Sequence, residues 1–151
     1  MWKDNYDKYL FDGSFSVETM PFDECDRALR NIFVSVLLGS LTNEDSKKVF
    51  NEIKNTAIFE IKKSNKGTID DILKKAENIG VSKNNDYGSD NILKFGIIGL
   101  VVRIGDKIAR FQNLSKAGSK QSVNDEKIED TLIDIVNYSV YGEMLSDGVW
   151  S

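Results

Sequence analysis

Residues 125–141 read DEKIEDTLIDIVNYSVY, and at helical spacing this stretch separates into two faces. The first face is apolar and consists of Ile128, Leu132, Ile135, Val136 and Val140. The second face is polar and consists of Glu126, Asp130, Asp134, Asn137 and Tyr141. This pattern predicts a helix packed against a core, from a capping segment at residues 122–124 to about Leu145.

A second stretch divides in the same way, from about Leu93 or Gly96 to Leu114. Its apolar stripe consists of Leu100, Ile104, Ile108, Phe111 and Leu114. Its polar stripe consists of Gly99, Arg103, Asp106, Arg110 and Asn113, with Lys107 at the edge. The short linker at 117–121 predicts antiparallel packing, so that carboxylates face arginines. This arrangement is typical either of a salt-bridge network or of a site for a metal ion and phosphate, and the residues alone leave both open.

Three more helices are expected upstream. Pro21 opens the first, which ends near Gly39; the second covers about residues 42–65, and the third runs from Thr68 to Gly80. Residues 83–90 are expected to form a polar loop, and residues 1–20 an irregular aromatic arm or a short helix. The predicted fold class is all-α, a single-domain bundle of about five helices. In it, residues 1–80 complete the bundle, residues 81–146 form the core unit, and residues 147–151 form a tail.

The composition limits the catalytic mechanisms, metal ions and partners that the chain can use. The chain has no histidine, which excludes Ser-His-Asp and Cys-His catalysis and favours oxygen-ligated Mg²⁺ or Mn²⁺ over zinc. Its net charge of −4 makes a nucleic acid an unexpected partner. A single cysteine, a polar N-terminus and apolar runs too short to span a bilayer predict a cytoplasmic protein without a membrane partner.

Three strings in this order resemble a known family. They are KNNDYG at 83–88, KFGIIGLVVRIGDKIARFQNL at 94–114 and DEKIEDTLIDIVNY at 125–138. Together they resemble the nucleotide modification associated domain 1 family, which is common in phage genomes and similar in turn to MazG-like all-α nucleotide pyrophosphohydrolases. The resemblance implies a MazG-like bundle, a nucleotide ligand and, for a phage-encoded protein, location in the host cytoplasm.

The resemblance also implies roles for the matching residues. As ligands of Mg²⁺ or Mn²⁺ it implies Asp106, Glu126, Asp130 and Asp134. As groups that neutralise the phosphates it implies Arg103, Lys107 and Arg110. During hydrolysis, Arg103 and Arg110 would stabilise the developing charge, and Asp134 is a candidate base. Further nucleotide contacts are expected from Asp86, Tyr87, Asn113, Asn137 and Tyr141.

Three functions are compatible with these residues. The first is Mg²⁺-dependent hydrolysis of a (deoxy)nucleoside triphosphate to the monophosphate and pyrophosphate. The second is binding or sequestration of a nucleotide without turnover, for example in phage counter-defence. It is motivated by a departure, because MazG-like enzymes carry a Glu-x-x-Glu pair where this chain has only Asp106. The third is a structural helical interaction module. Self-association is expected under all three, and the apolar run at 33–38 suits an interface or a core helix equally.

Overall fold

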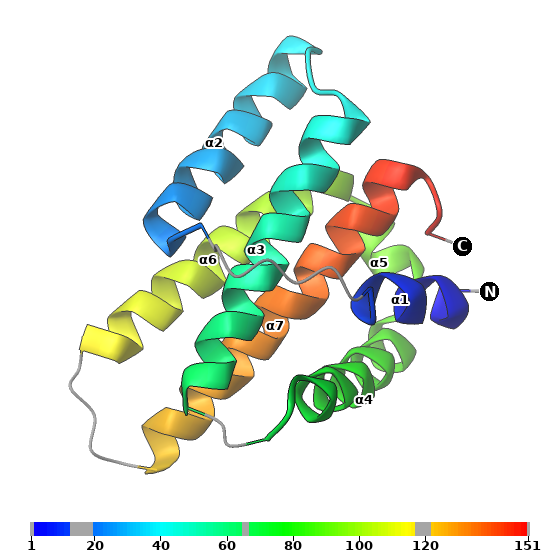
Figure 1. Cartoon of the computed structure of the whole chain (residues 1–151). Coiled ribbons are helices and arrows are strands. Elements are labelled where there is room, and N and C mark those ends of the chain that lie inside the picture. Colours follow the sequence, from blue (N-terminus) through cyan, green and yellow to red (C-terminus); the bar gives the residue numbers. More distant parts are fainter. Residues whose placement is uncertain (1, 13–19, 65–66, 117–121, 151) are drawn as a thin grey trace.

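The computed structural model describes residues 2–12, 20–64, 67–116 and 122–150, and for residues 122–125 it describes the backbone only. Over these ranges the chain is all-helical and contains no strand (Figure 1). The elements are α1 (Trp2–Leu10), α2 (Phe22–Leu38), α3 (Asn43–Ser64), α4 (Ile69–Tyr87), α5 (Asp90–Leu93), α6 (Gly96–Lys116) and α7 (Ser122–Asp147). None of these helices is long and apolar enough to cross a membrane.

Helix α7 lies at the centre of the structure. It packs chiefly against α3 and α6, and also against α1 and α4, while α6 runs antiparallel to it as expected (Figure 1). The predicted apolar face is confirmed, since Leu132, Ile135, Val136 and Val140 are buried and Ile128 is half-buried. Ile133 is buried as well, so α7 is enclosed on more sides than a single apolar face requires.

The expectation of about five helices is wrong, since the described ranges contain seven. The aromatic segment near the N-terminus forms α1, and the short helix α5 follows α4. Pro21 directly precedes α2, and Thr68 caps α4, where its hydroxyl accepts a hydrogen bond from the Asp71 N–H. These starting signals were therefore interpreted correctly.

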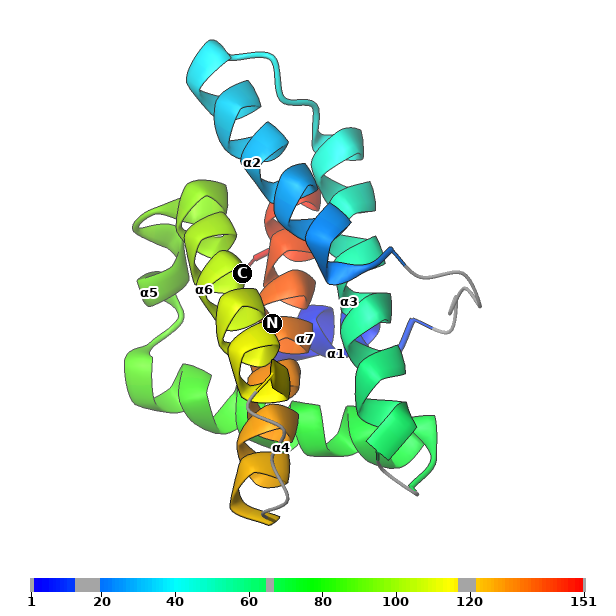
Figure 2. The same ribbon diagram turned by 90° about the vertical axis from the view of Figure 1, so that its left-hand side faces the viewer.

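The predicted end of the third long helix at Gly80 is also wrong. Helix α4 continues through Gly80 to Tyr87, so most of the expected loop at 83–90 is helical (Figure 2). The physical reason is close packing, because a Cβ atom at position 80 would lie 2.5 Å from the Tyr6 hydroxyl and 3.2 Å from Cγ of Asn137. Gly80 thus lets α4 approach α1 and α7 rather than ending the helix.

The apolar run in α2 divides between core and surface. Val36 is half-buried against the core, whereas Val34, Leu37 and Leu38 are exposed. The C-terminal end of α2 extends beyond the other helices (Figure 2). The run therefore packs only in part against the core and presents an exposed apolar surface at its C-terminal end. Such a surface is a feature of association sites.

A buried ion pair joins three helices. Lys54 on α3 lies 2.8 Å from the Glu143 carboxylate on α7, and each side chain is 1% exposed. Lys54 also donates a hydrogen bond of 3.0 Å to the Tyr9 carbonyl of α1. Burial raises the pKa of Glu143 and outweighs the opposing attraction of Lys54. The pair therefore fixes the relative positions of α1, α3 and α7 at an appreciable cost in desolvation.

This pair yields a prediction on stability. Replacing Lys54 alone (Lys54→Met) leaves the Glu143 carboxylate buried without its partner, and should lower the free energy of unfolding by about 3–5 kcal/mol. The double variant Lys54→Met/Glu143→Leu removes both charges and should be more stable than the single variant. Urea unfolding followed by circular dichroism measures both values.

The matched control is Lys74→Met, which removes the lysine of the exposed Asp70–Lys74 pair on α4. It should leave the unfolding midpoint nearly unchanged, because exposed pairs contribute little. Equal effects of Lys54→Met and Lys74→Met would contradict a structural role for the buried pair.

Candidate functional site

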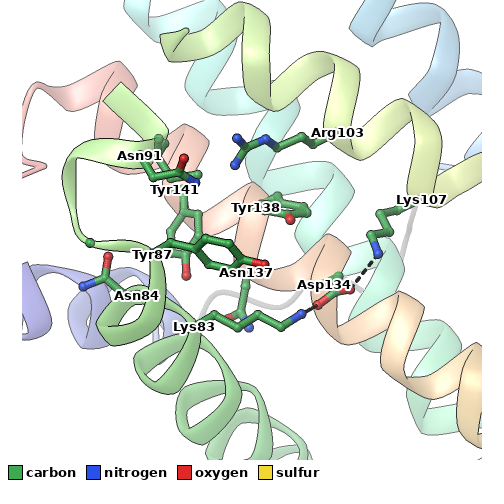
Figure 3. Close-up of a pocket in the computed structure, with 12 residues that line it drawn as sticks. Lys83, Asn84, Tyr87, Asn91, Arg103, Lys107, Asp134, Asn137, Tyr138 and Tyr141 are labelled. Carbon is green, nitrogen blue, oxygen red and sulfur yellow. Dashed lines mark hydrogen bonds and ion pairs between the residues drawn. The ribbon is translucent and has the colours of Figure 1, made fainter. Parts of the chain in front are cut away.

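A cleft of about 390 Å³ opens between the C-terminal end of α4, the turn into α5, and helices α6 and α7 (Figure 3). Its lining is mostly polar and aromatic and consists of Lys83, Asn84, Tyr87, Gly88, Asn91, Ile92, Arg103, Lys107, Asp134, Asn137, Tyr138 and Tyr141. The volume falls in the range of small-molecule sites, roughly 300–1,000 Å³.

Asp134 on α7 connects the three long helices of the cleft. Its Oδ1 lies 2.7 Å from the Lys83 ammonium of α4, and its Oδ2 lies 2.9 Å from the Lys107 ammonium of α6. Figure 3 shows the carboxylate held between the two lysines. The Asp134 side chain is 12% exposed, so both pairs are partly shielded from water. Burial works against the charge on Lys83, but the Asp134 carboxylate outweighs it and raises the pKa of Lys83. Lys83 is therefore cationic throughout the neutral range.

A second part of the cleft lining consists of Arg103 and three tyrosines, Tyr87, Tyr138 and Tyr141. The Arg103 guanidinium lies 5.9 Å from the centre of the Tyr138 ring, and the Tyr138 and Tyr141 rings are 6.2 Å apart. Tyr87 is 72% exposed, next to Gly88 at the end of α4. Burial raises the pKa of Tyr141, so its phenol is neutral at physiological pH. The cleft thus combines cationic groups with flat aromatic surfaces.

Asn137 links the cleft to α1 and α4. Its Nδ2 donates to the Ala76 carbonyl at 3.1 Å, and its Oδ1 accepts from the Tyr6 hydroxyl at 2.6 Å. The side chain is 4% exposed, and these two bonds fix the orientation of the amide. Asn137 lines the cleft, but both of its polar ends are already engaged in holding helices together.

Aromatic residues from both ends of the chain support the cleft from behind. Trp2 stacks on Tyr6 at 5.0 Å and meets Trp150 edge-on at 5.7 Å, and Trp150 packs against Tyr141. The Trp150 indole N–H donates to the Ser89 carbonyl at 2.8 Å, in the turn that borders the cleft. Helix α1 and the C-terminal tail therefore help to position residues of the site.

The structure separates the twelve predicted site residues into two groups. Those that line the cleft are Tyr87, Arg103, Lys107, Asp134, Asn137 and Tyr141. Those that are exposed and do not line it are Asp86, Asp106, Arg110, Asn113, Glu126 and Asp130. On α6 and α7, the polar stripes thus reach the cleft through one part of their length only.

The acidic residues that the structure describes do not assemble into a cation site within a single chain. Over the described residues, no group of three Asp, Glu, Cys or His side chains lies close enough together to hold a metal ion. Both oxygens of Asp134 are already paired with ammonium groups, and the other three predicted ligands are exposed. The residues present therefore do not fit a multi-carboxylate Mg²⁺ site of the kind used in phosphate chemistry, and Mg²⁺ or Mn²⁺ binding stays a prediction.

Four polar residues of the cleft were not predicted. They are Lys83, Asn84, Asn91 and Tyr138. The first two belong to the KNNDYG string, and extending α4 to Tyr87 places Lys83 and Tyr87 one turn apart on the same side of the helix. The KNNDYG string therefore contained Lys83 and Asn84, but they were not predicted as site residues because residues 83–90 were expected to form a loop.

A comparison with protein families matches the part of the chain that forms the cleft. Residues 83–145 match the family model described as nucleotide modification associated domain 1. Every residue that lines the cleft lies inside this segment. No curated protein and no solved structure matches the chain.

The packing behind the cleft can be tested through Gly80. The Gly80→Ala variant places a methyl group against Tyr6 and Asn137, and should destabilise the protein by about 1–3 kcal/mol despite the better helix propensity of alanine. The control is Gly105→Ala in α6, whose new Cβ would meet nothing within 4 Å and should stabilise by roughly 0.5–1 kcal/mol. Thermal unfolding of both variants measures the difference, and a stabilised Gly80→Ala protein would contradict the close approach of α4 to α7.

Proposed function

We propose that the protein binds a nucleotide in the cleft between α4, α6 and α7. The observation that carries this proposal is the convergence of three cationic side chains, Lys83, Arg103 and Lys107, with three tyrosines in one cleft. Phosphate groups are recognised by lysine and arginine, and bases stack on aromatic rings. The family match over the same residues supports a ligand of this class.

Each side chain has a distinct part in the proposed complex. Lys83 and Lys107 supply ammonium groups from opposite walls of the cleft, and Arg103 lies one turn before Lys107 on α6. Tyr87 is exposed at the entrance and available to stack on a base or ribose. Asn84 and Asn91 add amide groups that hydrogen-bond to sugar or base edges.

Hydrolysis of a nucleoside triphosphate to the monophosphate and pyrophosphate stays a prediction. It rests on the resemblance to MazG-like enzymes and requires several carboxylates at the cleft, which the residues that the structure describes do not gather there. Binding or sequestration without turnover needs none of them, and is for this reason the function we favour. A structural helical module would use the Lys83–Asp134 and Lys107–Asp134 pairs only to hold helices together, and would bind no nucleotide.

The test is a thermal melt of the purified protein with a panel of ribo- and deoxynucleotides, with and without Mg²⁺, together with a pyrophosphate assay on the same samples. A nucleotide at a hundredfold excess over its dissociation constant should stabilise the protein by roughly 2.7 kcal/mol. Stabilisation without pyrophosphate release supports binding, and release of pyrophosphate supports the hydrolase. The absence of any shift across the panel would contradict both and favour the structural module.

A matched pair of variants tests the location of the site. Arg103→Gln removes one cation from the cleft and should weaken nucleotide binding about tenfold or more, because charge-assisted hydrogen bonds contribute roughly 1.5–3 kcal/mol. Lys116→Gln makes the same change of charge on an exposed residue at the end of α6, outside the cleft. Calorimetric titration of both variants measures the difference, and equal affinities would place the nucleotide elsewhere.

We further propose that the protein self-associates through the exposed apolar end of α2. Leu37 is 67% and Leu38 74% exposed, so most of both apolar side chains is uncovered. A charge at this position, as in Leu37→Glu, should shift the sedimentation-equilibrium mass toward the monomer. A monomeric wild-type protein at all accessible concentrations would contradict the proposal.

A further inference from the structure

The charges in the cleft identify the class of nucleotide more narrowly. Lys83, Arg103 and Lys107 are cationic, and Asp134 is the one acidic side chain among the described residues that line the cleft. Two positive charges are therefore in excess. A phosphate monoester carries roughly −1.5 to −2 charges at pH 7, which balances this excess. A triphosphate carries more negative charge than these side chains neutralise.

The ion pairs of Asp134 argue against a metal ion in the cleft. One oxygen of the carboxylate accepts a hydrogen bond from Lys83 at 2.7 Å, and the other forms an ion pair with Lys107 at 2.9 Å. A divalent cation on Asp134 would displace both lysines and then lie beside two ammonium groups and the Arg103 guanidinium. The described residues of the lining include no second carboxylate to offset that repulsion, so the site disfavours a bound cation.

The same arrangement of charges favours a bound anion. The Asp134 carboxylate occupies the space between two ammonium groups from opposing helices, where the oxygens of a phosphate would find the same two donors (Figure 3). Carboxylate and phosphate accept hydrogen bonds from the same groups, so a phosphate competes with Asp134 for Lys83 and Lys107. Arg103, one turn from Lys107 on α6, adds a planar donor toward the tyrosines.

We propose that the cleft binds a nucleoside monophosphate without a metal ion, its phosphate drawing Lys83 and Lys107 away from Asp134. This inference rests on the proposed nucleotide site and adds the class of ligand and the mode of phosphate recognition. Asp134 then holds the two lysines in position while the cleft is empty, and the phosphate of the ligand displaces it from both. The base and ribose lie against the tyrosines at the open side of the cleft.

The experiment is a calorimetric titration of the full chain with the ribo- and deoxynucleoside monophosphates of all bases, first in EDTA and then in Mg²⁺. The expected result is the same dissociation constant in both buffers for at least one monophosphate. The matching nucleoside without phosphate should bind about tenfold more weakly or worse, because charge-assisted hydrogen bonds are lost. The matching triphosphate in EDTA should bind no more tightly than the monophosphate.

The Asp134→Asn variant gives opposite predictions for the two views of Asp134, and Lys107→Gln tests the phosphate contact. Asp134→Asn removes the competitor and raises the positive charge of the cleft, so the monophosphate should bind several-fold more tightly. If Asp134 were a metal ligand, the same change would weaken binding in Mg²⁺. Lys107→Gln should weaken binding about tenfold in both buffers. Circular dichroism confirms that each variant is folded, and the wild-type comparison of EDTA with Mg²⁺ decides the question if Asp134→Asn does not fold.

The outcomes separate this inference from the proposed function. Binding that appears only in Mg²⁺, or a folded Asp134→Asn variant that no longer binds, would overturn the metal-free monophosphate site and leave a nucleotide site in place. Failure of every nucleotide and nucleoside to bind in either buffer would overturn both.

Discussion

Helix α7 is enclosed over much of its length by α1, α3, α4 and α6, and three of its buried or nearly buried polar side chains pair with groups on these helices. Glu143 pairs with Lys54, Asn137 bonds to Tyr6 and to the Ala76 carbonyl, and Asp134 pairs with two lysines. These partners belong to α1, α3, α4 and α6. The polar residues of α7 therefore fix where the surrounding helices lie, and the cleft forms where this enclosure is incomplete.

The three polar positions differ in how far they are buried. Glu143 is fully buried and its pair with Lys54 is structural, whereas Asn137 lies at the base of the cleft with its amide committed to two helices. Asp134 is the one whose partners, Lys83 and Lys107, also face the cleft. A ligand can compete for those partners without disturbing the core. This gradient along one helix explains how the same kind of polar contact supports the fold at one end and a binding site nearer the middle.

Much of the fold follows from local sequence patterns. The apolar face of α7, the apolar stripe of α6 and the cap at Thr68 were predictable, because helical periodicity and capping depend on residues a few positions apart. The continuation of α4 was not, since the role of Gly80 depends on Tyr6, far away in the chain. The site was predictable in part for the same reason. Periodicity placed Arg103 and Asp134 on polar stripes, but which members of each stripe face the cleft depends on how α4 crosses α6 and α7.

The most direct test of this account is a crystal structure of the protein with a nucleoside monophosphate, grown in the presence of Mg²⁺. The account predicts the phosphate between the Lys83 and Lys107 ammonium groups, with Arg103 beside it, Asp134 released from both lysines and no metal ion on its carboxylate. A metal ion bound to Asp134 and bridging to the phosphate, with the two lysines turned away, would contradict it.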